Sequence, residues 1–583
     1  MSSSPLLPAI RLQRVAGLAA AILMVAVAAA PVFPAESKIT IPGNHPEEAA
    51  ELTTGEMASD RQLRITITLA LRNREQLEEL IAQQQDPSSP EYHRWLTPAE
   101  FNDRFGPTPD DRAAIEHWLT GSGLSVESVG AAGREVVATG AAATVEKAFA
   151  VKIATSADGG TYANLNDPEV PASVAPLIGS VRGLGNTLRF KNNLVTAANK
   201  VSPQATESGV TAFGPKDLWT FYDETGLNSA GTTGAGADCI ALVETADFED
   251  DALALFDATF GLPGTTVSRV LADGSNPGVG PPQAQSESDL DVEYSHAAAP
   301  GAPITAYLGA GANATVDALA RAVSDNTCGA ISLSFEFCGT GASFFSGTLN
   351  PILAQAEAQG QAVFAATGDE GAAGLKATSS GCVVAGGAPR VSELAADPHV
   401  TAVGGTQFTP TFDGSGNDVG YATESVWHDK APIPKSERGA SGGGRSSVFA
   451  KPSFQSGVFP KDKRRDIPDI SLGASAFNPG FFFAFGTPSQ LGIVGGTSLA
   501  TPVWAGISAL AAQSAGTTRV GNINAKLYAL GPLNNTASSG LHDVTIGNNS
   551  FNGVAGYSAK PGYDRATGWG TPDIGILVPM LGP

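Results

Sequence analysis

The sequence is poor in charge, and in positive charge above all. Charged residues make up 16% of the 583 residues, and 57 Asp and Glu outnumber 35 Lys and Arg, which gives a formal net charge of −22. A nucleic-acid partner is not expected, because phosphate binding needs a basic face. A carboxylate-rich surface instead suits acidic surroundings, where carboxylates take up protons and their mutual repulsion fades.

Cysteine is also scarce, with four residues and no CxxC pair among them. A zinc site is therefore not expected. We expect Cys338 to pair with Cys382, because the first follows a strand end and the second lies in a loop that can meet it. Cys239 and Cys328 each begin an apolar strand, and two buried thiols or a second disulfide are both compatible with that placement.

Long apolar runs are missing except at the N-terminus, where Arg11 and Arg14 precede an apolar stretch over 15–30. A charged start, a short apolar segment and small residues after it are typical of a secretory signal peptide, and the run is short for a membrane span. We interpret residues 1–35 as a signal peptide and expect an extracellular or periplasmic protein without a membrane anchor. An uncleaved anchor is the alternative.

Residues 36–190 are predicted to form a small α+β domain. Alternating and helical spacings, with a Pro-Asp-Asp helix start, predict its elements. In chain order these are a strand over 64–71, a helix over 73–85, two helices within 98–123, strands over 124–129 and 134–140, a helix over 144–150 and a strand over 151–156. This β-α-β-β-α-β order is typical of a ferredoxin-like sandwich.

Residues 191–208 are polar and without periodicity, which predicts an exposed linker open to proteolytic cleavage during maturation. Over 209–583, short apolar strands alternate with helical stretches, a pattern that predicts an α/β domain with a mostly parallel sheet covered on both faces. Functional residues of such sheets lie beyond the carboxyl ends of the strands. The clearest strands lie over 239–244, 303–309, 330–335 and 361–368.

The strongest local motif is GGTSLATPVWAG over 495–506. Its Gly-Gly-Thr turn puts Ser498 at the start of a helix, with the hydroxyl exposed and backbone N–H groups nearby, so we interpret Ser498 as a nucleophile. Pro502 falls near the first turn, where a missing N–H costs least. The alternative is that Ser498 only caps the helix.

None of the seven histidines stands in an H-G-T-H-like motif, which is the context expected of a histidine base for this serine. We expect His296, His399, His428 and His542 to be structural. Two carboxylates, Glu287 and Asp291, are instead spaced four apart, which places them on one face of a helix. Such a pair resists double ionisation, and one carboxylate can accept the serine proton in acid, where a histidine is already protonated.

A further carboxylate, Asp369, follows an apolar strand and a glycine. In its protonated form it can donate a hydrogen bond to an oxyanion that develops on a scissile carbonyl. The alternative is an ordinary aspartate in a turn.

Taken together, these residues resemble the sedolisin family of serine-carboxyl peptidases, which has a subtilisin-like fold. The resemblance covers nearly the whole chain. The stretch over 91–111 looks like the family's activation domain, and that over 213–223 looks like the start of the mature enzyme. Three further landmarks match, namely VTAVGGT over 400–406, SGGGRSS over 441–447 and RRDIPDIS over 464–471.

The resemblance implies roles for individual residues. Ser498 is the implied nucleophile, Glu287 the general base, and Asp291 its partner. Asp369 is the implied acid that stabilises the oxyanion. Glu244 matches a carboxylate that extends the network beyond Asp291, and Phe335 stands where some members carry a tryptophan, so that this extension is expected to be incomplete.

The same resemblance implies one structural calcium ion, bound near HDVTIGNN over 542–549 and KPGYD over 560–564. Asp543 and Asp564 would supply carboxylates, with backbone carbonyls from Val544, Lys560 and Gly562. Oxygen ligands from two loops suit calcium. Lys560 replaces a glycine of relatives, which a carbonyl ligand tolerates if the backbone angles allow.

The resemblance thus implies a zymogen of an acid-acting endopeptidase that cleaves itself and acts on proteins or peptides, with a monomer as the default state. An inactive binding protein on a peptidase scaffold is the rival from another class. A histidine-dependent serine peptidase is disfavoured by the missing histidine motif. An aspartic protease of the pepsin type would need Asp-Thr-Gly or Asp-Ser-Gly, and neither tripeptide occurs.

Overall fold

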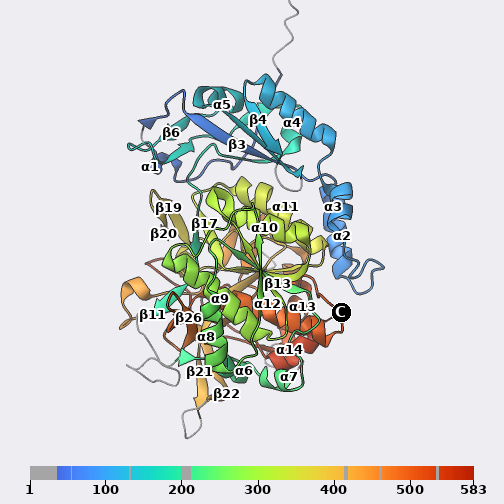
Figure 1. Cartoon of the computed structure of the whole chain (residues 1–583), viewed down its shortest axis with the longest axis vertical. Coiled ribbons are helices and arrows are strands. Elements are labelled where there is room, and N and C mark those ends of the chain that lie inside the picture. The colour runs from blue at the N-terminus through green and yellow to red at the C-terminus, as the bar shows by residue number, and fades with distance from the viewer. Residues whose placement is uncertain are drawn as a thin grey trace, which may run out of the picture. The chain divides into compact units, whose positions relative to one another are not determined.

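The computed structural model describes residues 36–53, 55–129, 133–197, 212–412, 418–458, 463–533 and 538–582. The chain from Lys38 onwards forms one compact unit (Figure 1). The predicted signal peptide over 1–35 and the second part of the predicted linker, over 198–208, lie outside the described residues. Within the described ranges, no helix combines the length and the hydropathy needed to cross a bilayer.

The N-terminal region is built on a four-stranded antiparallel sheet with the order β4-β5-β3-β9. Its strands are β3 (Gln62–Leu69), β4 (Ser125–Val129), β5 (Glu135–Ala141) and β9 (Ile178–Arg182). Helices α4 (Pro109–Gly121) and α5 (Ala142–Phe149) cover the sheet (Figure 1). Ile65 and Ile67 of β3 pack in one cluster with Ile115, Leu119 and Phe149 of these helices. This is the predicted ferredoxin-like order.

One strand of that prediction is wrong. The stretch 151–156 was expected to close the sheet, but β6 (Ile153–Thr155) pairs instead with β2 (Gly55–Glu56) and β7 (Tyr162–Asn164) in a separate three-stranded sheet. The closing strand is β9, which lies some twenty residues later and buries Ile178 and Val181 in the core. Another two-stranded sheet pairs β1 (Lys38–Thr40) with β8 (Glu169–Pro171).

The predicted helices α2 (Arg74–Gln85) and α3 (Pro98–Phe105) form, but they lie away from that sheet. Capping boxes at Thr97 and Thr108 begin α3 and α4. Phe101 and Phe105 pack with Ala354 and Ala358 of α11 (Asn350–Ala358), which belongs to the C-terminal region. The two regions therefore share an apolar contact.

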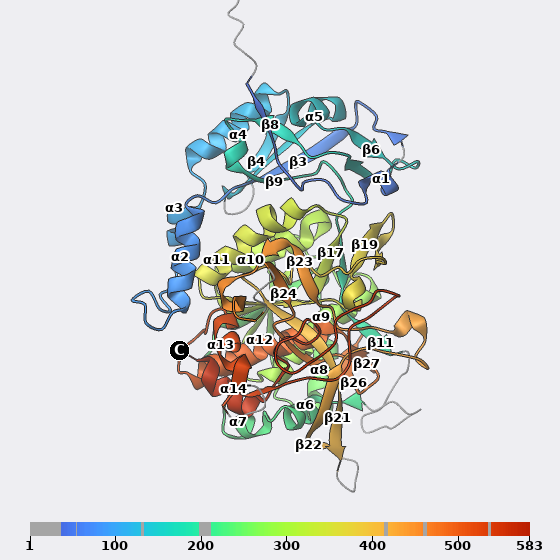
Figure 2. The same cartoon turned by 180° about the vertical axis from the view of Figure 1, so that it is seen from behind.

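The C-terminal region contains an eight-stranded sheet with the order β14-β15-β13-β16-β18-β21-β22, in which β25 also pairs with β21. Every pair is parallel except β21 with β22, which form the long hairpin seen in Figure 2. The prediction of a mostly parallel sheet is confirmed. The strands are β13 (Cys239–Glu244), β14 (Val267–Leu271), β15 (Ile304–Leu308), β16 (Cys328–Leu333), β18 (Ala362–Ala366), β21 (Thr401–Phe412), β22 (Asp418–Val426) and β25 (Ile470–Gly473).

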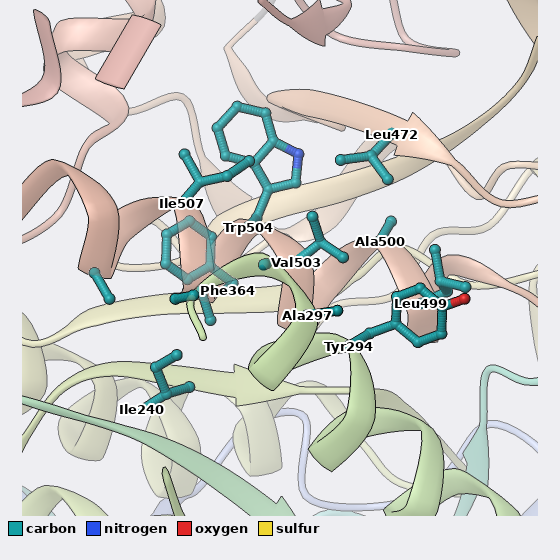
Figure 3. Close-up of a cluster of buried hydrophobic side chains, with 14 of the residues drawn as sticks. Ile240, Tyr294, Ala297, Phe364, Leu472, Leu499, Ala500, Val503, Trp504 and Ile507 are labelled. Carbon is teal, nitrogen blue, oxygen red and sulfur yellow. The ribbon is translucent and has the colours of Figure 1, made fainter. Parts of the chain in front are cut away.

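Helices cover both faces of this sheet. Because alternate residues of a strand point to opposite sides, each strand contributes side chains to the core on both faces. In β13, Ile240 and Leu242 belong to one core cluster, and Ala241 and Val243 belong to another. On the first face lie α9 (Pro282–Ala298) and α12 (Thr497–Ser514), whose Tyr294, Val503 and Trp504 appear with Ile240 in Figure 3. On the second face lie α10 (Ala314–Asp325) and α11.

Shorter elements complete this region. The helices are α6 (Pro215–Phe221), α7 (Thr225–Ser229), α8 (Asp250–Phe260), α13 (Asn524–Leu530) and α14 (Ile574–Leu581), with α1 (Ala49–Leu52) in the N-terminal region. The paired strands are β19 (Leu375–Thr378) with β20 (Gly381–Val384), β23 (Gly444–Ala450) with β24 (Arg464–Ile467), β26 (Gly480–Phe485) with β27 (Gln490–Gly495), and β28 (Leu541–His542) with β29 (Thr571–Pro572); β12 (Ala212–Phe213) also pairs with β26.

All four cysteines are paired. Cys338 and Cys382 form a disulfide, as predicted, between the end of β17 (Phe335–Cys338) and β20. The sequence left open whether Cys239 and Cys328 are buried thiols or a second disulfide. They form a disulfide between the neighbouring strands β13 and β16.

Candidate active site

Ser498 stands at the start of α12, shortly after β27 and after a glycine, Gly496, with a positive φ. Gly496 has φ +113°, and a Cβ there would lie 2.1 Å from the Asn193 carbonyl oxygen and 2.9 Å from Asp369 Oδ2. Only glycine lets these groups approach so closely. Pro502 lies deeper in α12 than predicted, in the second turn. It has no N–H to offer the Ser498 carbonyl, which instead accepts a hydrogen bond from Ser334 Oγ at 3.5 Å.

The two carboxylates predicted on one helix face lie on α9 and are buried. Glu287 is 2% exposed and Asp291 1%. Burial raises the pKa of Glu287 well above its usual value, while the Ser498 hydroxyl opposes that rise. Ser498 Oγ donates to the Ser334 carbonyl at 3.2 Å, and neither carboxyl oxygen of Glu287 has a hydrogen-bond partner among the described residues. Burial and the charge of Glu287 raise the pKa of Asp291, whose Oδ1 accepts a hydrogen bond from Ser334 Oγ at 3.0 Å. Two raised pKa values on adjacent turns mean that this pair retains protons above the usual carboxyl range.

Glu244, at the end of β13, extends this row of carboxyls. Its Oε2 accepts a hydrogen bond from Ser288 Oγ at 2.9 Å, and burial together with the charge of Asp291 raises its pKa. Phe335, by contrast, is buried in the apolar cluster on the other face of the sheet and packs edge-on against Phe337. The Phe335 side chain therefore adds no polar group to the row of carboxyls formed by Glu287, Asp291 and Glu244.

Asp369 lies on the other side of Ser498, after β18. Its Oδ1 accepts hydrogen bonds from the Thr497 backbone N–H at 2.8 Å and the Thr497 hydroxyl at 2.9 Å. Its Oδ2 has no hydrogen-bond partner among the described residues. Burial raises the pKa of Asp369 to about 7. A protonated Oδ2 at this place can donate to an oxygen close to Gly496.

Such an oxygen comes from the segment that was predicted to be an exposed linker. Within 191–197, two strands flank Asn193 and Leu194: β10 (Arg189–Asn192), antiparallel to β17, and β11 (Val195–Ala197), antiparallel to β27. Between them, the Asn193 N–H donates to the Ser334 carbonyl at 3.2 Å, and the Asn193 carbonyl accepts from the Ser498 N–H at 3.1 Å. The prediction failed because the pairing is made by backbone groups, which leave no side-chain pattern.

Three of the four histidines that were expected to be structural have partners for their rings. His296 Nε2 hydrogen bonds to the Pro263 carbonyl at 2.7 Å, and His399 Nδ1 contacts Glu357 at 2.6 Å. The ring of His542 stacks on Tyr421 with centroids 4.0 Å apart. The backbone N–H of His428 hydrogen bonds to the Gln407 side chain at 3.2 Å, whereas its ring lines the same cavity as Asp369, and its Nδ1 has no hydrogen-bond partner among the described residues.

The residues expected to bind a metal converge on one turn. Asp543 Oδ2 accepts the Gly562 N–H at 2.8 Å, and Asp564 Oδ2 accepts the Lys560 N–H at 3.0 Å. Gly562 has φ +76°, which suits the tight turn between them. Val544 directly follows Asp543. Two carboxylates and the carbonyls of one turn form an all-oxygen set, which fits calcium in ligand chemistry.

Comparisons with known proteins show the family of this chain. Residues 52–187 match the family model described as pro-kumamolisin, activation domain. Sedolisin from Pseudomonas sp. (strain 101) is 31% identical over 90% of this chain and 87% of its own length. Kumamolisin from Bacillus sp. (strain MN-32) is 29% identical over 90% of this chain and 92% of its own.

A solved structure of Pseudomonas sedolisin, a serine-carboxyl proteinase complexed with two molecules of pseudo-iodotyrostatin, matches with a TM-score of 0.53 and 30% identity. The match covers 63% of this chain and 97% of that one. Fold and comparisons together define the class as a serine-carboxyl peptidase made as a zymogen. The chain belongs to the sedolisin family and includes the family's activation domain.

The raised pKa of Asp369 links folding stability to pH. In the unfolded chain this carboxyl ionises at 3.8, whereas in the folded chain it keeps its proton up to about 7. The folded state therefore binds more protons between these values. The stabilisation is fully present below pH 3.8 and is lost as the pH rises through about 7. A shift of this size corresponds to roughly 4 kcal/mol.

We therefore expect the unfolding temperature of the full-length Ser498→Ala protein, which removes the candidate nucleophile, to fall as the pH rises from about 4 to about 7. Adding Asp369→Asn should lessen this dependence, because an amide does not titrate, while other buried carboxyls with raised pKa values, such as Asp289, keep part of it. Asp60→Asn, which changes an exposed carboxyl in a turn, is the control and should leave it unchanged. Calorimetry across this pH range makes the measurement, and an undiminished slope in the Asp369 variant contradicts the assignment.

Proposed function

We propose that this chain is the precursor of a secreted, acid-acting endopeptidase that hydrolyses protein or peptide substrates, with Ser498 as the nucleophile. In this proposal residues 1–35 are a signal peptide, 36–190 the activation domain, 191–208 the segment cleaved on maturation and 209–583 the peptidase domain. Export follows from the predicted signal peptide and is compatible with two disulfides. A monomer is the expected state.

The observation that supports this proposal best is the position of the Asn193–Leu194 peptide bond. The Asn193 carbonyl accepts the Ser498 N–H at 3.1 Å, and its oxygen lies beside Asp369 Oδ2 at Gly496. Antiparallel pairing with β17 on one side and with β27 on the other fixes this peptide as a substrate strand would be fixed. The chain thus presents one of its own peptide bonds to the candidate nucleophile.

The proposed reaction follows from these contacts. Ser498 Oγ attacks the carbonyl carbon while Glu287 accepts its proton, and Asp291, whose pKa the charge of Glu287 raises, retains the proton of the pair. The oxyanion accepts hydrogen bonds from the Ser498 N–H and from protonated Asp369. Glu287 then returns the proton to the leaving amine, and water releases the acyl group by the same steps in reverse. Because Glu287 and Asp291 resist double ionisation, the pair holds one proton over an acidic range, and its ionised member can accept the Ser498 proton where an imidazole would already be protonated.

Replacing the nucleophile or the base should abolish hydrolysis. We expect Ser498→Ala and Glu287→Gln each to lower kcat/KM by about a thousandfold or more. The assay is digestion of denatured casein from about pH 3 to about pH 8 after acid incubation, where activity should be confined to acid. Ser508→Ala, a buried serine on the same helix, is the matched control and should stay active. Activity that peaks near pH 8 would point to a histidine base, and folded protein without activity would point to a binding protein.

The first cut in maturation should fall between Asn193 and Leu194, because this is the peptide bond held at Ser498. Acid incubation of the full-length protein should give an earliest C-terminal fragment that begins at Leu194. Mass spectrometry over a time course locates the cut, and the Ser498→Ala precursor should remain intact. An earliest fragment that begins within 198–208 contradicts this bond but leaves the nucleophile unaffected.

We also propose one structural calcium ion, with Asp543 and Asp564 as carboxylate ligands and the carbonyls of Val544, Lys560 and Gly562 completing the set. The ion would tie the 560–564 turn to the loop after β28. Calcium would stabilise the folded protein against unfolding, because only the folded state brings these ligands together.

Calcium at a hundredfold excess over its dissociation constant should stabilise the folded protein by about 2.7 kcal/mol. Thermal unfolding with calcium against a chelator measures this gain, with magnesium as the comparison ion. Asp543→Asn and Asp564→Asn should each remove the calcium response, whereas Asp251→Asn, on the exposed side of α8, should retain it. A calcium response that survives both aspartate substitutions would place the ion elsewhere.

A further inference from the structure

Two buried glutamates that the proposed mechanism does not use lie next to Asp369. Glu370 follows it directly and is 3% exposed, and Glu336 lies on β17 and is 2% exposed. Their carboxyls hydrogen bond to each other, and Glu370 Oε2 also accepts the Asp369 N–H at 3.0 Å. Burying two carboxyls side by side costs free energy unless a proton or a cation compensates.

The compensating cation is Lys191, from the strand that crosses the site. Its Nζ forms an ion pair with Glu370 Oε1. Lys191 stands directly opposite Glu336 in the antiparallel β10–β17 pair, so that the two side chains lie on the same face. The position of this lysine is therefore fixed by backbone register as well as by charge.

The protonation states agree with this geometry. Burial alone would raise the pKa of Glu370, but Lys191 and the Glu336 hydrogen bond lower it below its usual value. Burial and the charge of Glu370 raise the pKa of Glu336 well above its usual value. The cluster thus holds one proton on Glu336, one anion on Glu370 and one ammonium group.

Lys191 lies two residues before Asn193, whose carbonyl is held at Ser498, and so occupies the third position before the proposed scissile bond. A cut at Asn193–Leu194 severs Lys191 from the peptidase domain. When the activation domain leaves, Glu370 loses its cation but stays beside the cleft, where it lines a cavity of about 810 Å³ with Asp369. An ionised carboxylate in that position favours a replacement cation on the next peptide strand to bind.

We propose that Glu336 and Glu370 form a subsite for a lysine side chain at the third residue before the scissile bond of a substrate. This inference rests on the proposed function, because it takes the strand at Ser498 as a guide to substrate binding. Glu370 is the specificity-determining residue that supplies the charge, and Glu336 positions it through the shared proton.

The test uses enzyme matured by acid from the full-length protein and peptides that copy residues 189–196 with a fluorophore and a quencher. One peptide keeps lysine at the third position, and the other has norleucine, which has a similar length and no charge. We expect kcat/KM for the lysine peptide to exceed that for the norleucine peptide by roughly 10- to 100-fold. Comparable values for two cleaved peptides overturn the subsite and leave the proposed function standing.

Variants then assign the preference to the glutamates. Glu370→Gln should reduce the lysine-to-norleucine ratio to within about threefold, chiefly through the lysine peptide, and Glu336→Gln should reduce it partly. Because the ratio is taken within each variant, a general loss of activity cancels. Glu437→Gln, which changes a glutamate lining the same cavity, is the matched control and should keep the wild-type ratio. An unchanged ratio in Glu370→Gln, or an equal fall in Glu437→Gln, overturns the assignment.

A third result separates this inference from the function on which it rests. If the wild-type protein cleaves neither peptide nor casein, the proposed function fails and the subsite fails with it. If casein is digested and the norleucine peptide is cleaved as well as the lysine peptide, only the subsite fails. The comparison of the two peptides on the wild-type enzyme needs no variant to fold.

Discussion

The packing of α9 against α12 is the contact on which the site depends. A Cβ on Gly506 of α12 would lie 2.5 Å from the Cβ of Ala298 on α9, so the two helices meet as closely as backbones allow. Glu287 and Asp291, on the same helix α9, are buried. Buried carboxyls are stable only with protons or hydrogen bonds to share, so the carboxyls gathered here favour their protonated forms.

Two kinds of contact hold the segment over 189–197 in the site, and they differ in what they recognise. Backbone pairing with β17 and β27 is independent of sequence, because every residue but proline offers the same N–H and carbonyl. The ion pair of Lys191 with Glu370 depends on one side chain. Binding strength can thus come from the main chain while discrimination comes from the buried charge.

Much of this arrangement could be predicted from the sequence where a side-chain pattern exists. The spacing of Glu287 and Asp291 places them on one helix face, and the turn before Ser498 and the strand before Asp369 place these residues at element ends. Helices with capping boxes, such as α3 and α4, were predicted within a few residues. In each case local geometry decides the position, and tertiary packing only confirms it.

The rest depends on long-range pairing that leaves no local pattern. The stretch 151–156 has the alternating pattern of a strand, yet β9 is the segment that pairs with β3 at this edge of the sheet. Which of two possible strands pairs with β3 depends on tertiary packing, and the alternation of either segment does not decide it. Lys191 and Glu336 are far apart in the chain, and each alone is an unremarkable charge. Their meeting follows from β10–β17 register, which the sequence does not encode locally.

The path of β10 through the site has a consequence for how the enzyme is released. The proposed cut after Asn193 would leave residues 189–193 paired as before, so the severed activation domain would remain a product that still fills the cleft. The cut would turn binding within one chain into binding between two molecules. Before the cut, residues 189–193 are tethered in the cleft at a high effective concentration. After it, the free activation domain would compete with substrates at its bulk concentration. Under the proposed maturation, dilution would therefore complete an activation that cleavage only begins.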